Sequence, residues 1–116
     1  MVSVKWSDWM FLMGKLTVEY KVPKNKSGVY VLSSAKSSEN IYYVGQGNLQ
    51  ECLIRHLEAE ENPALREAFK KLCYFKFAIV EKESDRKGAE RFLYDKLKPK
   101  CNKKCPEDPA VEINLP

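Results

Sequence analysis

Three side chains have types and positions that could support proton transfer or metal binding. Tyr30 lies in "SGVYVL" and Tyr43 in "YYVGQG", each in a short β-rich run. Either phenol taken alone is better explained as a packed strand residue. Glu90 lies three residues before Leu93 and seven before Leu97, where helical spacing predicts an apolar residue. A carboxylate at such a position either reaches solvent or faces a cation such as a metal ion.

The elements that must position these residues begin with β-rich runs. These runs predict strands over residues 29–32, 41–44 and 73–80. Gly45 and Gly47 are expected to end the second strand, and Asn48 can then cap a helix that runs to about Glu60. The first two strands, joined by a polar loop, suggest a hairpin.

Two further helices complete the central part of the chain. Asn62 and Pro63 begin the first of them, since proline suits the first helical position. Its apolar stripe consists of Leu65, Ala68, Phe69 and Leu72. Ser84 or Asp85 can cap the last helix, which must end before Pro99 because the residue ahead of a proline avoids helical geometry.

The two ends of the chain give weaker patterns. Residues 6–13 predict a short helix capped by Ser7 or Asp8. Residues 15–22 alternate apolar and polar, which is the period of a half-buried strand, although an extended arm would show the same pattern. We therefore expect an extension over residues 1–27, a compact domain over 28–102 and an irregular tail over 103–116. The predicted fold class is α+β, a small three-stranded antiparallel sheet flanked by helices in the order β-β-α-α-β-α.

Composition sets limits on partners and compartment. The 116 residues suffice for one compact domain, and 20 Lys+Arg against 16 Asp+Glu give a net charge of +4. This mild excess permits a polyanionic partner without demanding one. No apolar run approaches the roughly 20 residues that cross a bilayer, so we expect no membrane association and a cytoplasmic location.

The cysteines do not form a recognisable metal motif. Only Cys101 and Cys105 are close in sequence, as C-x3-C, while Cys52 and Cys73 lie far from them. A structural zinc site normally needs four ligands, often as two close pairs, and the second pair is missing. We therefore expect free thiols.

Taken together, the motifs resemble the GIY-YIG nuclease family. "GVY" at 28–30 stands for the first signature and "YVG" at 43–45 for the second, followed by a helix that carries His56 and by Glu90 in "GAERFLYDKLKPKCN". The resemblance extends from Gly28 to about Asn102. It implies the family fold and phosphodiester cleavage with one divalent metal, Mg²⁺ or Mn²⁺.

The resemblance also implies roles for individual residues. Tyr30 would activate or orient the attacking water, although a phenol with an ordinary pKa of about 10 needs help to act as a base. Tyr43 and His56 would line the same site, and Glu90 would bind the metal, which stabilises the leaving oxygen. The expected substrate-binding residues are Gly45, Gly47, Asn102, Lys98 and Lys100.

One family residue is displaced. The family usually places a phosphate-holding arginine four residues before the histidine, where this chain has Cys52, and the nearby Arg55 is the alternative catalytic candidate. At about 100° per residue, Cys52 lies on the flank of His56, whereas Arg55 lies almost opposite Leu53. We therefore expect Cys52 rather than Arg55 to face the site. The neutral Gln46, where some relatives carry a lysine, would remove another positive charge.

These observations support functions of different classes. The first is a metal-dependent endonuclease, slow on plain duplex DNA because the arginine is displaced. The second is a degenerate relative that binds nucleic acid without cutting it, and the third is a protein-interaction module. DNA is favoured over RNA as the nucleic acid, and a partner protein would supply specificity.

Overall fold

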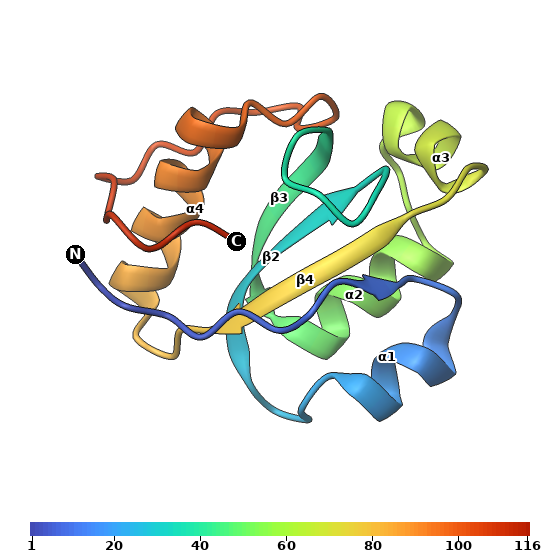
Figure 1. Ribbon diagram of the computed structural model, residues 1–116, viewed down its shortest axis with the longest axis horizontal. Coiled ribbons are helices and arrows are strands. Elements are labelled where there is room, and N and C mark those ends of the chain that lie inside the picture. The colour runs from blue at the N-terminus through green and yellow to red at the C-terminus, as the bar shows by residue number, and fades with distance from the viewer.

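A four-stranded antiparallel sheet separates two layers of helices (Figure 1). The computed structural model describes residues 1–116, with the strands in the order β1-β4-β2-β3. The strands are β1 (Met10–Phe11), β2 (Ser27–Ser33), β3 (Ile41–Asn48) and β4 (Tyr74–Ile79). The helices are α1 (Lys15–Lys21), α2 (Leu49–Glu58), α3 (Pro63–Phe69) and α4 (Glu83–Leu97). The α+β class is confirmed, with four strands instead of three.

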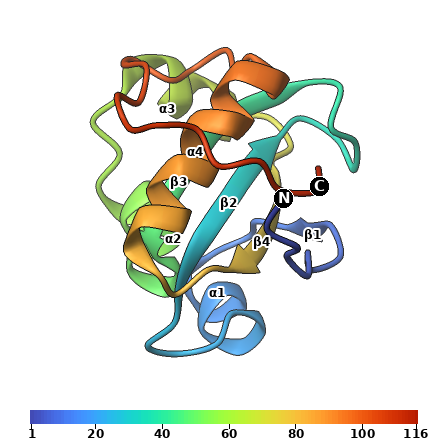
Figure 2. The same cartoon turned by 90° about the vertical axis from the view of Figure 1, so that its left-hand side faces the viewer.

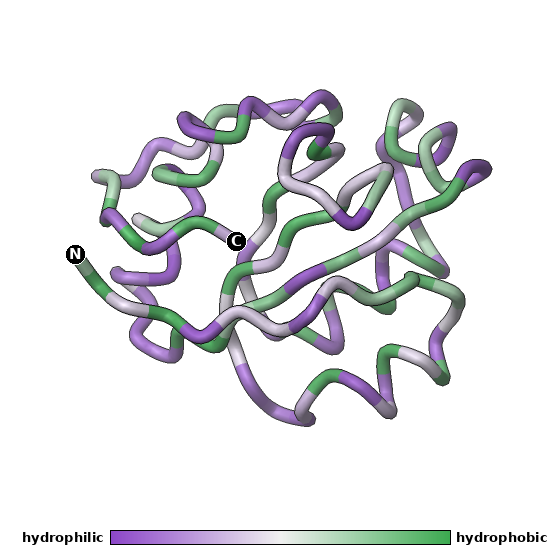
Figure 3. Tube along the Cα trace, viewed as in Figure 1, coloured by the Kyte–Doolittle hydropathy of each residue, from purple (hydrophilic) through white to green (hydrophobic).

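Alternation along β2 divides the core in two. Tyr30 and Leu32 join the core that α1, α2 and α3 cover, whereas Val29 and Val31 join the core under α4. Figure 2 shows α4 on one side of the sheet, and Figure 3 shows hydrophobic residues along the central strands. A site built from both helical layers must therefore lie at an edge of the sheet, where the layers meet.

β3 is such an edge, and a segment that follows α4 covers it. The backbone N–H groups of Lys100 and Cys101 donate to β3 carbonyls at 3.1 and 2.7 Å. Asn102 forms two hydrogen bonds between its side-chain amide and the Val44 backbone, at 3.0 and 2.9 Å. This segment satisfies edge groups that would otherwise be unpaired and brings the tail beside β3.

The expected helix caps are partly confirmed. Asn48 and Asn62 cap α2 and α3, each accepting backbone N–H bonds through its side-chain oxygen. The prediction that Ser84 or Asp85 caps α4 is wrong, because the helix begins earlier, after Lys82, and has no side-chain cap. α4 ends at Leu97, ahead of Pro99, as predicted.

Other predictions along the central part need correction. β3 does not end at Gly45 but continues to Asn48, because Gly45 and Gly47 pair with Tyr30 and Gly28 across the hairpin. Leu72 lies outside α3 and is largely exposed.

The predicted helix over residues 6–13 is wrong. This segment is extended and adds to the open edge of β4: Ser7 N–H donates to the Phe77 carbonyl at 2.8 Å, and Met10 pairs with Phe75. The Ser7 hydroxyl, expected to cap a helix, instead accepts the Phe77 N–H at 3.0 Å.

The predicted strand over residues 15–22 is also wrong, since residues 15–21 form α1. The tail contains no helix or strand, yet Ile113 is buried against α4 and bridges Val2. The Val2–Ile113 bridge places the first and last segments of the chain beside each other, although Figure 1 shows the N and C ends themselves apart. No helix is both long and apolar enough to span a membrane.

Candidate active site

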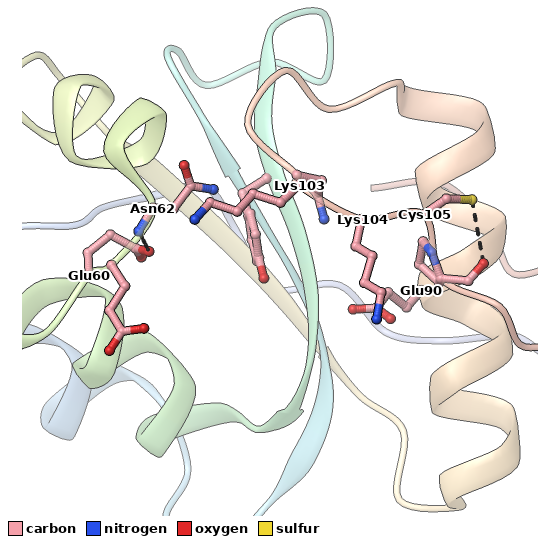
Figure 4. Close-up of a pocket in the computed structure, with 10 residues that line it drawn as sticks. Glu60, Asn62, Glu90, Lys103, Lys104 and Cys105 are labelled. Carbon is pink, nitrogen blue, oxygen red and sulfur yellow. Dashed lines mark hydrogen bonds between the residues drawn. The ribbon is translucent and has the colours of Figure 1, made fainter.

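A pocket of about 410 Å³ lies across the edge of β3, between the α2–α3 connection and α4 (Figure 4). Most of the side chains that line it are polar or charged, and they include Tyr43, Glu60, Asn62, Glu90, Lys103 and Lys104. The pocket therefore brings Tyr43 and Glu90 together, as the sequence predicted. Tyr30 is not part of its lining.

Tyr30 lies beneath the pocket. Its side chain is only 1% exposed, and its ring crosses Gly45, its partner in the β2–β3 pairing. A Cβ atom at Gly45 would lie 2.3 Å from the Tyr30 hydroxyl. Gly45 therefore serves to admit the tyrosine ring, and that space is not open to a phosphate. Burial raises the pKa of Tyr30 well above its ordinary value, so the phenol is un-ionised at neutral pH.

The Tyr30 hydroxyl contacts a histidine that is itself held by a carboxylate. The hydroxyl oxygen lies 2.6 Å from Nε2 of His56, and Nδ1 of His56 forms a hydrogen bond with Glu60. Burial lowers the pKa of His56 below its ordinary value, and the hydrogen bond to Glu60 offsets part of this shift. The result is a neutral imidazole between a phenol and a carboxylate.

Tyr43 packs on this pair and faces the pocket. Its ring centroid lies 6.2 Å from that of Tyr30 and 4.9 Å from that of His56. The Tyr43 hydroxyl forms no hydrogen bond within the chain, so it is free to contact a ligand. Burial, followed by the nearby charges of Glu90 and Glu60, raises the pKa of Tyr43.

Glu90 enters the pocket from α4, opposite Glu60 (Figure 4). It is half-buried and belongs to no ion pair or hydrogen bond. Burial, with a contribution from the like charge of Asp108, raises its pKa from 4.5 to about 7. The structure contains no group of three or more His, Cys, Asp or Glu side chains that could hold a metal. A lone carboxylate nevertheless fits Mg²⁺, which commonly keeps several waters and takes further ligands from substrate phosphates.

Arg55 does not point away from the site. Its backbone lies on the exposed side of α2, as the helix geometry predicted, but the side chain bends back so that Nη2 lies 3.9 Å from Sγ of Cys52. Arg55 also lines a hollow of about 300 Å³ with Tyr43 and His56. Its charge acts to lower the pKa values of both Tyr30 and Tyr43. The expectation that Cys52 rather than Arg55 faces the site is therefore wrong.

Cys52 lies beneath this arginine rather than in the pocket. Its thiol donates to the Gln46 carbonyl at 3.8 Å, and burial raises its pKa. Gly47, at φ 139°, has a conformation that L side chains rarely adopt, and a Cβ there would lie 2.9 Å from the thiol. The Gln46 side chain accepts a hydrogen bond from Arg86 at 2.9 Å, so α4 supplies a positive charge at this point.

The expected substrate-binding lysines are not in the pocket. Lys98 forms the left-handed end of α4, and Lys100 lies 3.5 Å from the Asn40 side chain; both are exposed and outside the lining. Lys103 and Lys104 occupy the pocket instead. Asn102 does line the pocket, but its amide oxygen and nitrogen each form a hydrogen bond with the Val44 backbone.

Sequence reasoning missed Glu60, and it included Lys103 and Lys104 only in a run of lysines over residues 96–104 that could meet phosphates, not as part of this pocket. The spacing of His56 and Glu60, four residues apart, was a usable signal, since such residues are neighbours on one helix face. Lys103 and Lys104 lie in the segment assigned to an irregular tail, where nothing in the pattern links them to β3.

No protein-family model matches the chain, and no curated protein or solved structure matches it.

Proposed function

We propose that this chain is a metal-dependent endonuclease of the GIY-YIG type, which hydrolyses phosphodiester bonds in the pocket beside β3. The observation that carries the proposal is the meeting of the free Tyr43 hydroxyl and the unpaired Glu90 carboxylate in one polar pocket. A phenol and a carboxylate that lack partners within the chain are available to a substrate and a metal.

The charges in the pocket support the need for a divalent cation. Three acids, Glu60, Glu61 and Glu90, line it together with two lysines, Lys103 and Lys104. A phosphodiester would be repelled by this set unless a cation offset the carboxylates. Glu90 would hold Mg²⁺ or Mn²⁺, and a bound metal would stabilise the leaving oxygen.

The two tyrosines have different roles in this proposal. Tyr43 is the phenol that a substrate can touch, and its hydroxyl would orient the attacking water. Tyr30, to which the family resemblance gives this role, is buried and already bonded to His56. Tyr30 therefore acts through its neighbours.

Positive side chains on both sides of Tyr43 would bind the nucleic acid. Lys103 and Lys104 lie on the Glu90 side, and Arg55 lies in the adjoining hollow, whose lining shares Tyr43 with the pocket. A guanidinium offers a planar fork of donors that matches a phosphate. We infer that a single strand of DNA crosses Tyr43 between these charges. All four cysteines are free thiols, which favours a reducing, cytoplasmic location.

The test uses end-labelled oligonucleotides, both single-stranded and duplex, of DNA and of RNA. Wild type with Mg²⁺ should cut DNA, and EDTA should abolish cutting. Binding without cutting in Mg²⁺ and in Mn²⁺ would instead favour the second candidate, a degenerate module that binds nucleic acid. The cysteine at position 52, where the family usually has an arginine, is the observation that supports this candidate.

A further inference from the structure

Glu60 lies at the centre of a chain of hydrogen bonds that joins both sides of the pocket. One carboxylate oxygen contacts Nδ1 of His56, and the other accepts the Asn62 backbone N–H at 2.9 Å. His56 continues the chain to the Tyr30 hydroxyl at 2.6 Å, and the Asn62 amide donates to the Cys101 carbonyl at 2.6 Å. The side chains of His56 and Glu60 are 6% and 12% exposed, so water cannot readily replace a lost partner.

The carboxylate decides which nitrogen of His56 carries the proton. A carboxylate accepts hydrogen bonds, so the Nδ1 that faces Glu60 must be the N–H. Nε2 is then bare and accepts the Tyr30 hydroxyl, which gives each buried donor an acceptor. The opposite tautomer would turn a lone pair toward the carboxylate and leave the Tyr30 O–H unpaired, which is costly in a buried site.

We propose that Glu60 is a positioning residue, which fixes the proton of His56 on Nδ1 and so holds Tyr30 and His56 as the surface that orients the Tyr43 ring. The Tyr43 ring contacts both partners, edge-on to His56 and stacked on Tyr30. This role rests on the proposed function, because Tyr43 is the phenol that meets the substrate there.

The test exploits the fact that His56 is the only histidine in the chain. Long-range proton–nitrogen NMR of wild type at neutral pH should show one imidazole, protonated at Nδ1. In Glu60→Gln the side-chain carbonyl stays with the Asn62 N–H, so its NH₂ group faces Nδ1 and the proton should move to Nε2. Glu58→Gln is the matched control, because this exposed α2 residue pairs only with Lys15. It should keep the wild-type tautomer.

A wild-type proton on Nε2, or an unchanged tautomer in Glu60→Gln, would overturn the assignment. Thermal unfolding of each variant confirms that it is folded. In steady-state cleavage, kcat of Glu60→Gln should fall roughly tenfold to 100-fold with little change in KM. An unchanged kcat would overturn the positioning role. Wild type could cut nothing while His56 is protonated at Nδ1 in wild type and at Nε2 in Glu60→Gln. In that case the nuclease proposal fails, and the effect of Glu60 on His56 stands.

Discussion

The guanidinium of Arg55 lies over the thiol of Cys52, with Nη2 3.9 Å from Sγ. These residues are three apart on α2, and the longer side chain bends back toward the position that the shorter one occupies. The positive charge of Arg55 thus lies near Tyr30 and Tyr43, although position 52, where the family usually has the arginine, holds a cysteine. Arg55 belongs to no ion pair, so most of its donors are free for a phosphate.

We therefore predict that Arg55→Ala lowers the rate of DNA cleavage by about 100- to 1,000-fold, the usual cost of removing a charge-stabilising donor. Arg66→Ala, which removes an exposed arginine from α3, is the matched control and should cut normally. The measurement is a single-turnover time course with labelled DNA. Wild-type activity in Arg55→Ala, with faster cutting by Cys52→Arg, would instead show that the position of Cys52 faces the substrate.

Glu90 gives a prediction about stability and pH. The unfolded chain ionises this group near 4.5, and the folded protein near 7, so its contribution to folding stability falls as pH rises between these values. Full burial would make the loss about 3 kcal/mol, and solvent screening of this half-buried group reduces it to about 1–2 kcal/mol.

Glu90→Gln should accordingly raise the unfolding temperature at pH 8 by several degrees and change it little at pH 5. The measurement is calorimetric unfolding in EDTA at both values. Equal shifts at the two pH values would show that ionisation of Glu90 has no part in the effect.

Metal binding should depend on the same carboxylate. Mn²⁺ titrated into wild type should broaden the NMR signals of Tyr43 before those of distant residues, and Glu90→Ala should remove this broadening. Binding should also strengthen from pH 6 to pH 8, because only the ionised carboxylate is a ligand. Identical broadening in the two proteins would place the metal elsewhere.

Gly45→Ala should destabilise the fold. The added Cβ would lie 2.3 Å from the Tyr30 hydroxyl, and overpacking of a tight core typically costs about 1–3 kcal/mol. Gly14→Ala is the control, since nothing lies within 4 Å of a Cβ there. Denaturant unfolding compares the two. Equal stability would mean that the Tyr30 ring can leave its position at little cost.

Binding to DNA should weaken steeply as salt rises, because phosphate contacts release counterions. The double variant Lys103→Gln, Lys104→Gln should reduce the salt slope by about 2, if each lysine contacts one phosphate. Lys98→Gln, Lys100→Gln, which removes two exposed lysines outside the pocket, should leave the slope near wild type. Fluorescence anisotropy over a salt series measures both slopes, and equal losses would show that the pocket has no special part in binding.

The central strands and their helices were predictable because their patterns are unambiguous. Residues 15–22 were not predictable, since the alternating apolar residues also form two pairs four residues apart, Leu16 with Tyr20 and Val18 with Val22. Residues four apart lie on the same face of a helix. Val18 in α1 and Val22, just after the helix, face the core, whereas Leu16 and Tyr20 in α1 are 82% and 84% exposed. The same pattern of apolar and polar residues therefore fits a strand and a helix that has a second, exposed apolar face. Only the packing of this segment against α2 decides between the two structures.

The candidate site was predictable in its residue types but not in its contacts. The family resemblance implied that Tyr43 and Glu90 belong to one site, and the structure brings them into one pocket. The burial of Tyr30 depends on Gly45 across the hairpin, and the position of Arg55 depends on side-chain rotamers. Neither is encoded in helical or strand periodicity.

The most direct test of the central claim is the nicking rate of supercoiled plasmid by wild type and Glu90→Gln, purified in parallel, over a series of Mg²⁺ concentrations. Wild type should nick at a rate that rises with Mg²⁺ and falls to background in EDTA. Glu90→Gln should remain at background although it is the more stable protein at pH 8. No nicking by wild type at any Mg²⁺ concentration, or equal nicking by both proteins, would contradict the assignment of this pocket as a metal-dependent nuclease site.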